Sequence, residues 1–79
     1  YTQASRFEMS RYLIIIEATG TGFSAYSPDL PGCVATAESR LEVEQKMKEA
    51  IQFHVDGLRE EGLPVPAPRS QAAYCEVGS

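Results

Sequence analysis

The segment 40–61 has the residue pattern of an amphipathic helix, and this pattern constrains the fold more than any other feature of the chain. Ser39 is a good N-cap residue, and Glu42 stands three residues later as its capping-box partner. Gly62, with Pro64 just beyond it, is typical of a helix end. On a helical wheel the residues of the apolar face fall within an arc of roughly 140°. They are Val43, Met47, Ala50, Ile51, His54, Val55 and Leu58. A helix with a single apolar face must bury that face against another layer.

The other apolar segments of the chain predict the strands of that layer. Three precede the helix and one follows it: 11–17, 23–27, 33–37 and 72–77. The first is rich in β-branched isoleucine and is apolar at both parities, which favours a central strand covered on both faces. Glycines at 20 and 22 permit a hairpin after it, and the proline-rich residues 63–69 form an extended connector. The sequence therefore predicts an α+β fold of order β-β-β-α-β, an antiparallel sheet covered on one face by a single helix.

Length and charge narrow the range of functions. The chain has 79 residues, which is one domain; we predict it over 11–79 and interpret the polar residues 1–10 as a tail or an expression remnant. Seven Lys plus Arg against eleven Asp plus Glu give a formal net charge of -4, which offers little material for a basic face that grips nucleic acid. The longest apolar run, 12–16, is too short to span a membrane. We therefore expect a cytoplasmic protein that does not contact the membrane.

The sequence contains no recognisable pattern of catalytic or metal-binding residues. Cys33 and Cys75 lack the close spacing of zinc ligands, and we interpret them as two small buried thiols in a reducing compartment. His54, the only histidine, lies within the apolar arc and belongs to no assignable triad. Glu17 and Asp29 are single acids on separate elements, whereas two-metal sites need several ligands. We therefore expect no enzyme activity, no metal and no cofactor.

Two places on the predicted fold suit contact with a protein partner through named side chains. Asp29 and Leu30 lie in the corner 28–33 (PDLPGC), where two prolines and a glycine restrict the backbone and lower the entropy lost on binding. Asp29 can cap backbone N–H groups there or face a cation of the partner. Phe53 projects toward the polar side of the helix, either as a lid over a neighbouring loop or as an interface anchor. We take all three as partner-binding candidates.

A third place is the sheet face that a single helix cannot cover. Tyr26, Val34 and Tyr74, with one parity of the first strand, are expected to form an exposed apolar surface. Such a surface usually marks an interface. We therefore add Tyr26 to the partner-binding candidates and expect a homodimer or a complex with another protein.

Several motifs, taken in order, resemble those of the bacterial HicB-like antitoxin family. They are the aliphatic strand that begins at Tyr12, the segment 23–27 (FSAYS) running into 28–33, residues 49–51 (EAI) on the helix, and 62–68 (GLPVPAP) after it. The resemblance covers about 11–77 and implies a partial ribonuclease H-like fold without that fold's catalytic acids. It also implies a function, which is to bind and neutralise a small basic HicA-type toxin that cleaves mRNA. Family members commonly oligomerise. Fuller members add a C-terminal DNA-binding domain, which we do not expect here because the chain ends just after the last predicted strand.

Other functions stay open on the sequence. A sheet with one helix can present a face to RNA, although the acidic charge and the lack of a basic aromatic sheet motif count against an RNA-binding module. A general protein-interaction module unrelated to a toxin is a further alternative. A small hydrolase or nuclease would require Glu17 or Asp29 to act with a metal. A short basic reading frame beside this gene would favour the toxin partner most directly.

Overall fold

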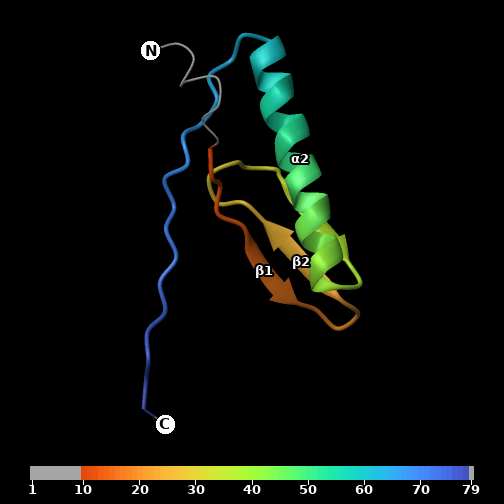
Figure 1. The fold of residues 1–79 in the computed structure, drawn as a ribbon, viewed down its shortest axis with the longest axis vertical. Coiled ribbons are helices and arrows are strands. Elements are labelled where there is room, and N and C mark those ends of the chain that lie inside the picture. The colour runs from red at the N-terminus through yellow and green to blue at the C-terminus, as the bar shows by residue number, and fades with distance from the viewer. Residues whose placement is uncertain (1–9, 79) are drawn as a thin grey trace.

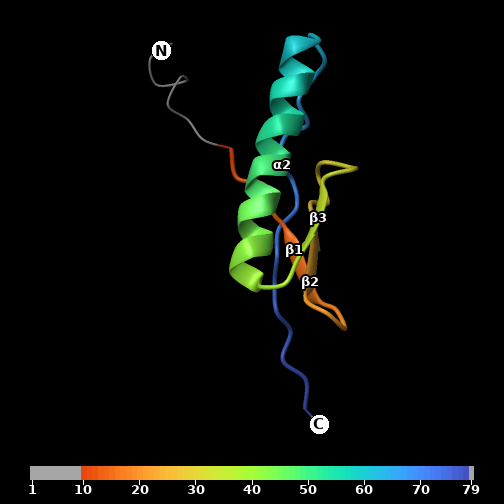
Figure 2. The ribbon, with the colours of Figure 1, turned by 90° about the vertical axis from the view of Figure 1, so that its right-hand side faces the viewer.

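The computed structural model describes residues 10–78, which form a three-stranded antiparallel sheet with one helix lying across one of its faces (Figures 1 and 2). The elements follow the chain as β1 (Ile15–Ala18), β2 (Phe23–Tyr26), β3 (Val34–Ala37) and α2 (Arg40–Glu60). The sheet order is β1-β2-β3. This arrangement confirms the predicted α+β class, the antiparallel meander and the single covering helix. Of the tail predicted over 1–10, residues 1–9 lie outside the described residues.

The hairpin between β1 and β2 depends on Gly22 for space rather than for an unusual dihedral angle. Thr19 closes the turn, because its backbone N–H donates to the Gly22 carbonyl at 2.8 Å and its hydroxyl accepts from the Gly22 N–H at 2.9 Å. A Cβ added at Gly22 would collide with the backbone oxygen of Ala37 at the end of β3. The absence of a side chain at Gly22 therefore allows the turn to approach the neighbouring strand closely.

The strand register sorts the sheet residues onto two faces. Ile16 pairs with Ala25, which pairs with Ala35, and the next row joins Ala18, Phe23 and Ala37. With the exception of Ala18, these residues belong to the hydrophobic core or pack against it. Successive residues of a strand point to opposite faces, so the alternate rows must lie on the side away from α2.

Helix α2 begins and ends as its sequence predicts. The Ser39 hydroxyl accepts from the Glu42 backbone N–H at 3.1 Å, which caps the first turn. At the other end Gly62 adopts a φ of 71°, and the Leu63 N–H donates to the Leu58 carbonyl at 2.9 Å. These are the features of a Schellman motif, which satisfies the last carbonyls of a helix. Because both signals act within a few residues, they can be read directly from the sequence.

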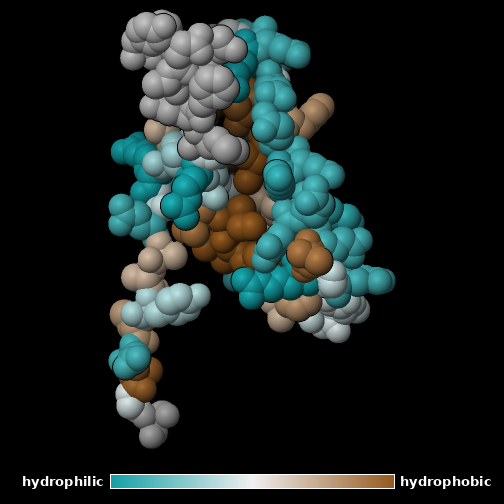
Figure 3. All heavy atoms as spheres, in the orientation of Figure 1, coloured by the Kyte–Doolittle hydropathy of each residue, from teal (hydrophilic) through white to brown (hydrophobic). Residues whose placement is uncertain are grey.

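The core lies between α2 and the sheet. The fully buried side chains are Val43 and Met47 of α2 and Leu30 of the β2–β3 connection. The helix packs mainly over β3 and β2. Hydrophobic surface gathers over β1 beside the helix, where Ile14 and Ile16 are only partly buried (Figure 3).

The predicted strand over 72–77 does not form in the structure. Within the described residues this segment pairs with no strand, and it extends away from the body of the domain (Figure 1). Its large apolar side chains are not packed on the sheet, as Tyr74 is 98% exposed and Val77 is 84% exposed. The prediction of a central first strand is therefore also wrong: β1 lies at an edge and β2 occupies the centre. Cys75 belongs to the same segment and is exposed, so of the two thiols predicted to be buried only Cys33 is.

Among residues 10–78, no helix combines the length and the apolar character that crossing a membrane requires.

Candidate protein-binding surfaces

The carboxylate of Asp29 holds the C-terminal segment against the corner that links β2 to β3. Its Oδ2 atom accepts from the backbone N–H groups of Arg69 and Ser70, each at 2.9 Å, and its Oδ1 atom accepts from the Ser70 hydroxyl at 2.9 Å. These hydrogen bonds favour the charged carboxylate and lower the pKa of Asp29, with the Ser70 N–H making the largest contribution and the Arg69 N–H the next. We call this arrangement the Asp29 clasp. The sequence left open whether Asp29 caps backbone N–H groups or contacts a partner. In the structure it caps two backbone N–H groups that lie about forty residues further along the chain.

Leu30 is directed inward by the same corner. The Leu30 N–H donates to the Ser27 carbonyl at 3.2 Å, and the Cys33 N–H donates to the Leu30 carbonyl at 3.1 Å. Gly32 takes a φ of 91°, a conformation that other residues rarely adopt. The turns place Leu30 in the core with no exposed surface. Burial also raises the pKa of the Cys33 thiol. The structure therefore gives Asp29 and Leu30 roles within the chain.

An apolar row crosses the sheet on the face opposite α2. Ile15 of β1 pairs with Tyr26 of β2, which pairs with Val34 of β3, and this set is called the outer row below. Tyr26 is 42% exposed and Val34 is 65% exposed. The sequence located Tyr26 and Val34 here, but only the register adds Ile15 as their neighbour. Tyr74, predicted on the same face, lies instead on the unpaired C-terminal segment.

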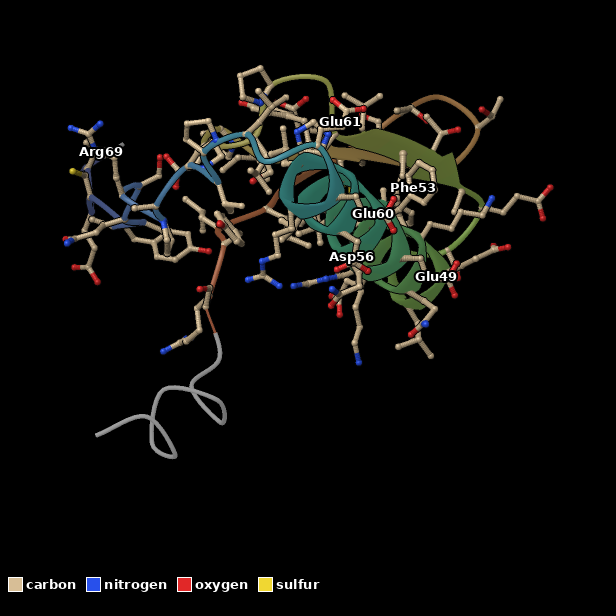
Figure 4. All side chains as sticks on the ribbon, turned by 90° about the horizontal axis from the view of Figure 1, so that it is seen from above. Glu49, Phe53, Asp56, Glu60, Glu61 and Arg69 are labelled. Carbon is tan, nitrogen blue, oxygen red and sulfur yellow. The ribbon has the colours of Figure 1, made fainter. Side chains whose placement is uncertain are left out.

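The second exposed surface lies on the outer side of α2, around Phe53. The ring is 82% exposed, which leaves little of it to cover a loop and favours an anchor over a lid. Glu49 precedes it by four residues, Asp56 follows by three and Glu60 by seven, so all three lie on its side of the helix (Figure 4). We call these four residues the Phe53 face. The sequence analysis identified Phe53 as a candidate, and the helical spacing of the three acidic residues from Phe53 can be read from the sequence as well.

The charge of the Phe53 face is not neutralised by ion pairs within the described residues. The one salt bridge found in residues 10–78 joins Arg40 to Glu44, elsewhere on the helix. Glu49 accepts from the Gln45 amide at 3.2 Å, and Asp56 accepts from the Gln52 amide at 2.9 Å. Both donors are neutral groups. An exposed aromatic ring beside carboxylates that form no ion pair among the described residues is complementary to a basic protein surface.

The described part of the chain contains no cluster of metal-binding side chains. Within 10–78, no group of three or more His, Cys, Asp or Glu side chains lies close enough together to hold a metal ion.

Comparison with known proteins identifies the family. The model of the HicB-like antitoxin of bacterial toxin–antitoxin systems matches residues 12–77. The chain belongs to the HicB-like antitoxin family. This confirms the resemblance drawn from the ordered motifs of the sequence.

Relatives of this HicB-like chain include proteins of known structure. It matches a chain of the HicA3 and HicB3 toxin–antitoxin complex with a TM-score of 0.64 and 33% identity, over 76% of this chain and 70% of that one. The HicB3 antitoxin crystal structure matches with the same score and identity but over 44% of its own length. An uncharacterized 14.9 kDa protein from the rep-hol intergenic region of Haemophilus phage HP1 (strain HP1c1) is 36% identical over 55 residues, which are 70% of this chain and 41% of the phage protein. The chain thus spans less than half the length of the phage protein and of the HicB3 antitoxin.

Proposed function

We propose that this chain is the toxin-binding part of an antitoxin and neutralises a HicA-type, mRNA-cleaving toxin by direct contact. The observation that carries the proposal is the match, at 33% identity, to a structure in which a HicB3 antitoxin is in complex with the HicA3 toxin. The family match over 12–77 supports the same role. We assign the chain no catalytic residue, because its part in this mechanism is to cover the toxin.

The Phe53 face is the surface we assign to the toxin. Its Phe53 ring supplies the kind of aromatic anchor that dominates protein interfaces, and three carboxylates on the same helix face attract a basic partner. Oppositely charged surfaces speed association and disfavour wrong partners. Two copies of this chain would repel each other here, so the charge favours a different protein over self-association at this surface.

The outer row on the sheet suits a second copy of this chain. Ile15, Tyr26 and Val34 carry no charge, and they run across the whole sheet opposite the helix. A twofold dimer places the same patch of each copy against the other, which an uncharged apolar row permits. We therefore propose a homodimer through the outer row, with both Phe53 faces left free for toxins.

Co-expression with a HicA-type toxin encoded in the same genome tests the antitoxin role. We expect the toxin to co-purify with this chain, and stoichiometric addition of the chain to stop mRNA cleavage by the purified toxin. A genome with no HicA-type reading frame, or a toxin that neither binds nor loses activity, would refute the proposal.

The dimer is tested separately by light scattering coupled to size exclusion. Val34→Glu introduces a charge into the exposed outer row and is expected to give a monomer that still binds toxin. Leu41→Glu, on the 79% exposed Leu41 of α2, is the matched control and should leave the dimer intact. A monomeric wild-type protein, or a Val34→Glu variant that stays dimeric, would contradict the assignment of the outer row.

A further inference from the structure

Gly57 lies in the last turn of α2, and the described residues supply no packing reason for a glycine there. Glycine inside a helix is destabilising relative to alanine, so it is usually kept where a side chain would clash. A Cβ added at Gly57 meets nothing within 4 Å. The helix geometry does not require glycine either, because Gly57 does not have a positive φ. The described residues therefore leave the space beside Gly57 open to a group of another molecule.

The open space at Gly57 is a shallow hollow next to Phe53. It has a volume of about 250 Å³ and is lined by Phe53, His54, Gly57, Leu58 and Glu61. Gly57 comes one turn after Phe53, so the missing side chain leaves one side of the aromatic ring accessible. The hollow thus has apolar walls from Phe53 and Leu58, the imidazole of His54 and a carboxylate from Glu61.

Charge around the hollow selects the kind of group that fits it. Glu61 takes part in no salt bridge within residues 10–78, and Glu60 adds a carboxylate on the adjoining helix surface (Figure 4). Lys46 lies about three turns before Gly57 on the same helix, and it donates to the Thr36 carbonyl of β3 at 3.2 Å. A side chain that lies across the hollow therefore contacts apolar walls along its length and a carboxylate at one edge.

We propose that the Gly57 hollow receives a lysine or arginine side chain of the toxin, an inference that rests on the proposed antitoxin function. Such a side chain combines an aliphatic stem with a cationic head, which matches apolar walls with a carboxylate at one edge. The stem packs against Phe53 and Leu58, and the head lies beside Glu61. A cation near the Phe53 ring is also attracted by the ring's negative face. Any side chain larger than glycine at 57 occupies the same space.

The test measures toxin affinity and thermal stability on the same variants. Gly57→Gln fills the hollow with a good helix former, so we expect the Tm to rise by about 2–8 °C while the affinity for the toxin falls at least tenfold. Phe53→Ala removes the ring and should weaken binding to a similar extent. Glu61→Gln removes only the charge at that edge, and it should weaken binding several-fold while reducing the dependence of affinity on salt.

Two control variants separate the hollow from general effects of mutating α2. Leu41→Ala removes an equally exposed apolar side chain, and Glu44→Gln removes a carboxylate of the same helix away from the hollow. Both should bind the toxin within twofold of the wild type. The inference is overturned if wild-type protein binds the toxin and the Gly57→Gln variant binds it equally well. A wild-type protein that binds no toxin refutes the proposed function instead, so the two failures are distinguishable.

Discussion

Replacing Leu30 by alanine distinguishes a core residue from a partner contact. The sequence predicts Leu30 as a partner contact, because it lies in a restricted corner between two prolines. In the structure its side chain has no exposed surface and belongs to the core cluster with Val43 and Met47. A side chain with no exposed surface acts on stability, and it affects a partner only through the fold.

The expected cost follows from that complete burial. Removing three carbon atoms from an apolar site loses about 2.4 kcal/mol, at about 0.8 kcal/mol for each carbon. The cavity that remains adds about 24 cal/mol for each Å³ that the surroundings fail to fill. We therefore expect Leu30→Ala to lower the free energy of unfolding by about 3–5 kcal/mol. A domain of this length has about 4–12 kcal/mol in total, so the variant should be close to unfolding.

Urea denaturation followed by circular dichroism measures this change, with Leu41→Ala as the exposed control. The control should lie within about 0.5 kcal/mol of the wild type. In thermal denaturation, the Tm of Leu30→Ala should fall by about 12 °C or more, at roughly 4 °C for each kcal/mol of lost stability. A Leu30→Ala protein with wild-type stability but weaker toxin binding would show that the leucine is a surface contact and that our account of the corner is wrong.

Three further predictions concern the turn, the clasp and the thiols. Gly22→Ala should cost about 1–3 kcal/mol on urea denaturation because its Cβ meets backbone, whereas Gly20→Ala, with open space around it, should be nearly neutral. Because the pKa of Asp29 is lowered, its contribution to stability is complete above its ordinary pKa of 3.8 and is lost as the pH falls through the lowered pKa. Asp29→Asn should therefore flatten the pH dependence of the unfolding midpoint below pH 3.8. An Asp29→Asn variant with the same acid profile as the wild type would contradict the clasp. In native protein a thiol reagent should modify Cys75 quickly and Cys33 only after unfolding, and equal rates would rule out the burial described here.

The candidate surfaces could be located from the sequence only in part. Phe53 and its acidic neighbours belong to one helix, so helical spacing alone places them on one side. Tyr26 and Val34 were placed on the uncovered face by the alternation of strand residues. Ile15 could not be added without the register, because its neighbours on both parities are also apolar.

Local interactions explain what the sequence determined by itself. The bounds of α2 depend on contacts within a turn or two of the chain, namely the Ser39 cap and the Gly62 terminus. The three strands that precede the helix have clear turn residues between them. The motifs that mark the family lie along the same stretches, which is why their order in the sequence is enough to indicate the family.

Only the tertiary structure decided how distant segments use each other. The Asp29 clasp joins residues about forty positions apart, and no local pattern at either end identifies its partner. The segment 72–77 has the composition of a strand, yet a strand exists only when another edge accepts its backbone hydrogen bonds. Leu30 is buried because the folded corner closes over the core. In each case the deciding energy comes from non-local packing or hydrogen bonding, which a linear pattern does not contain.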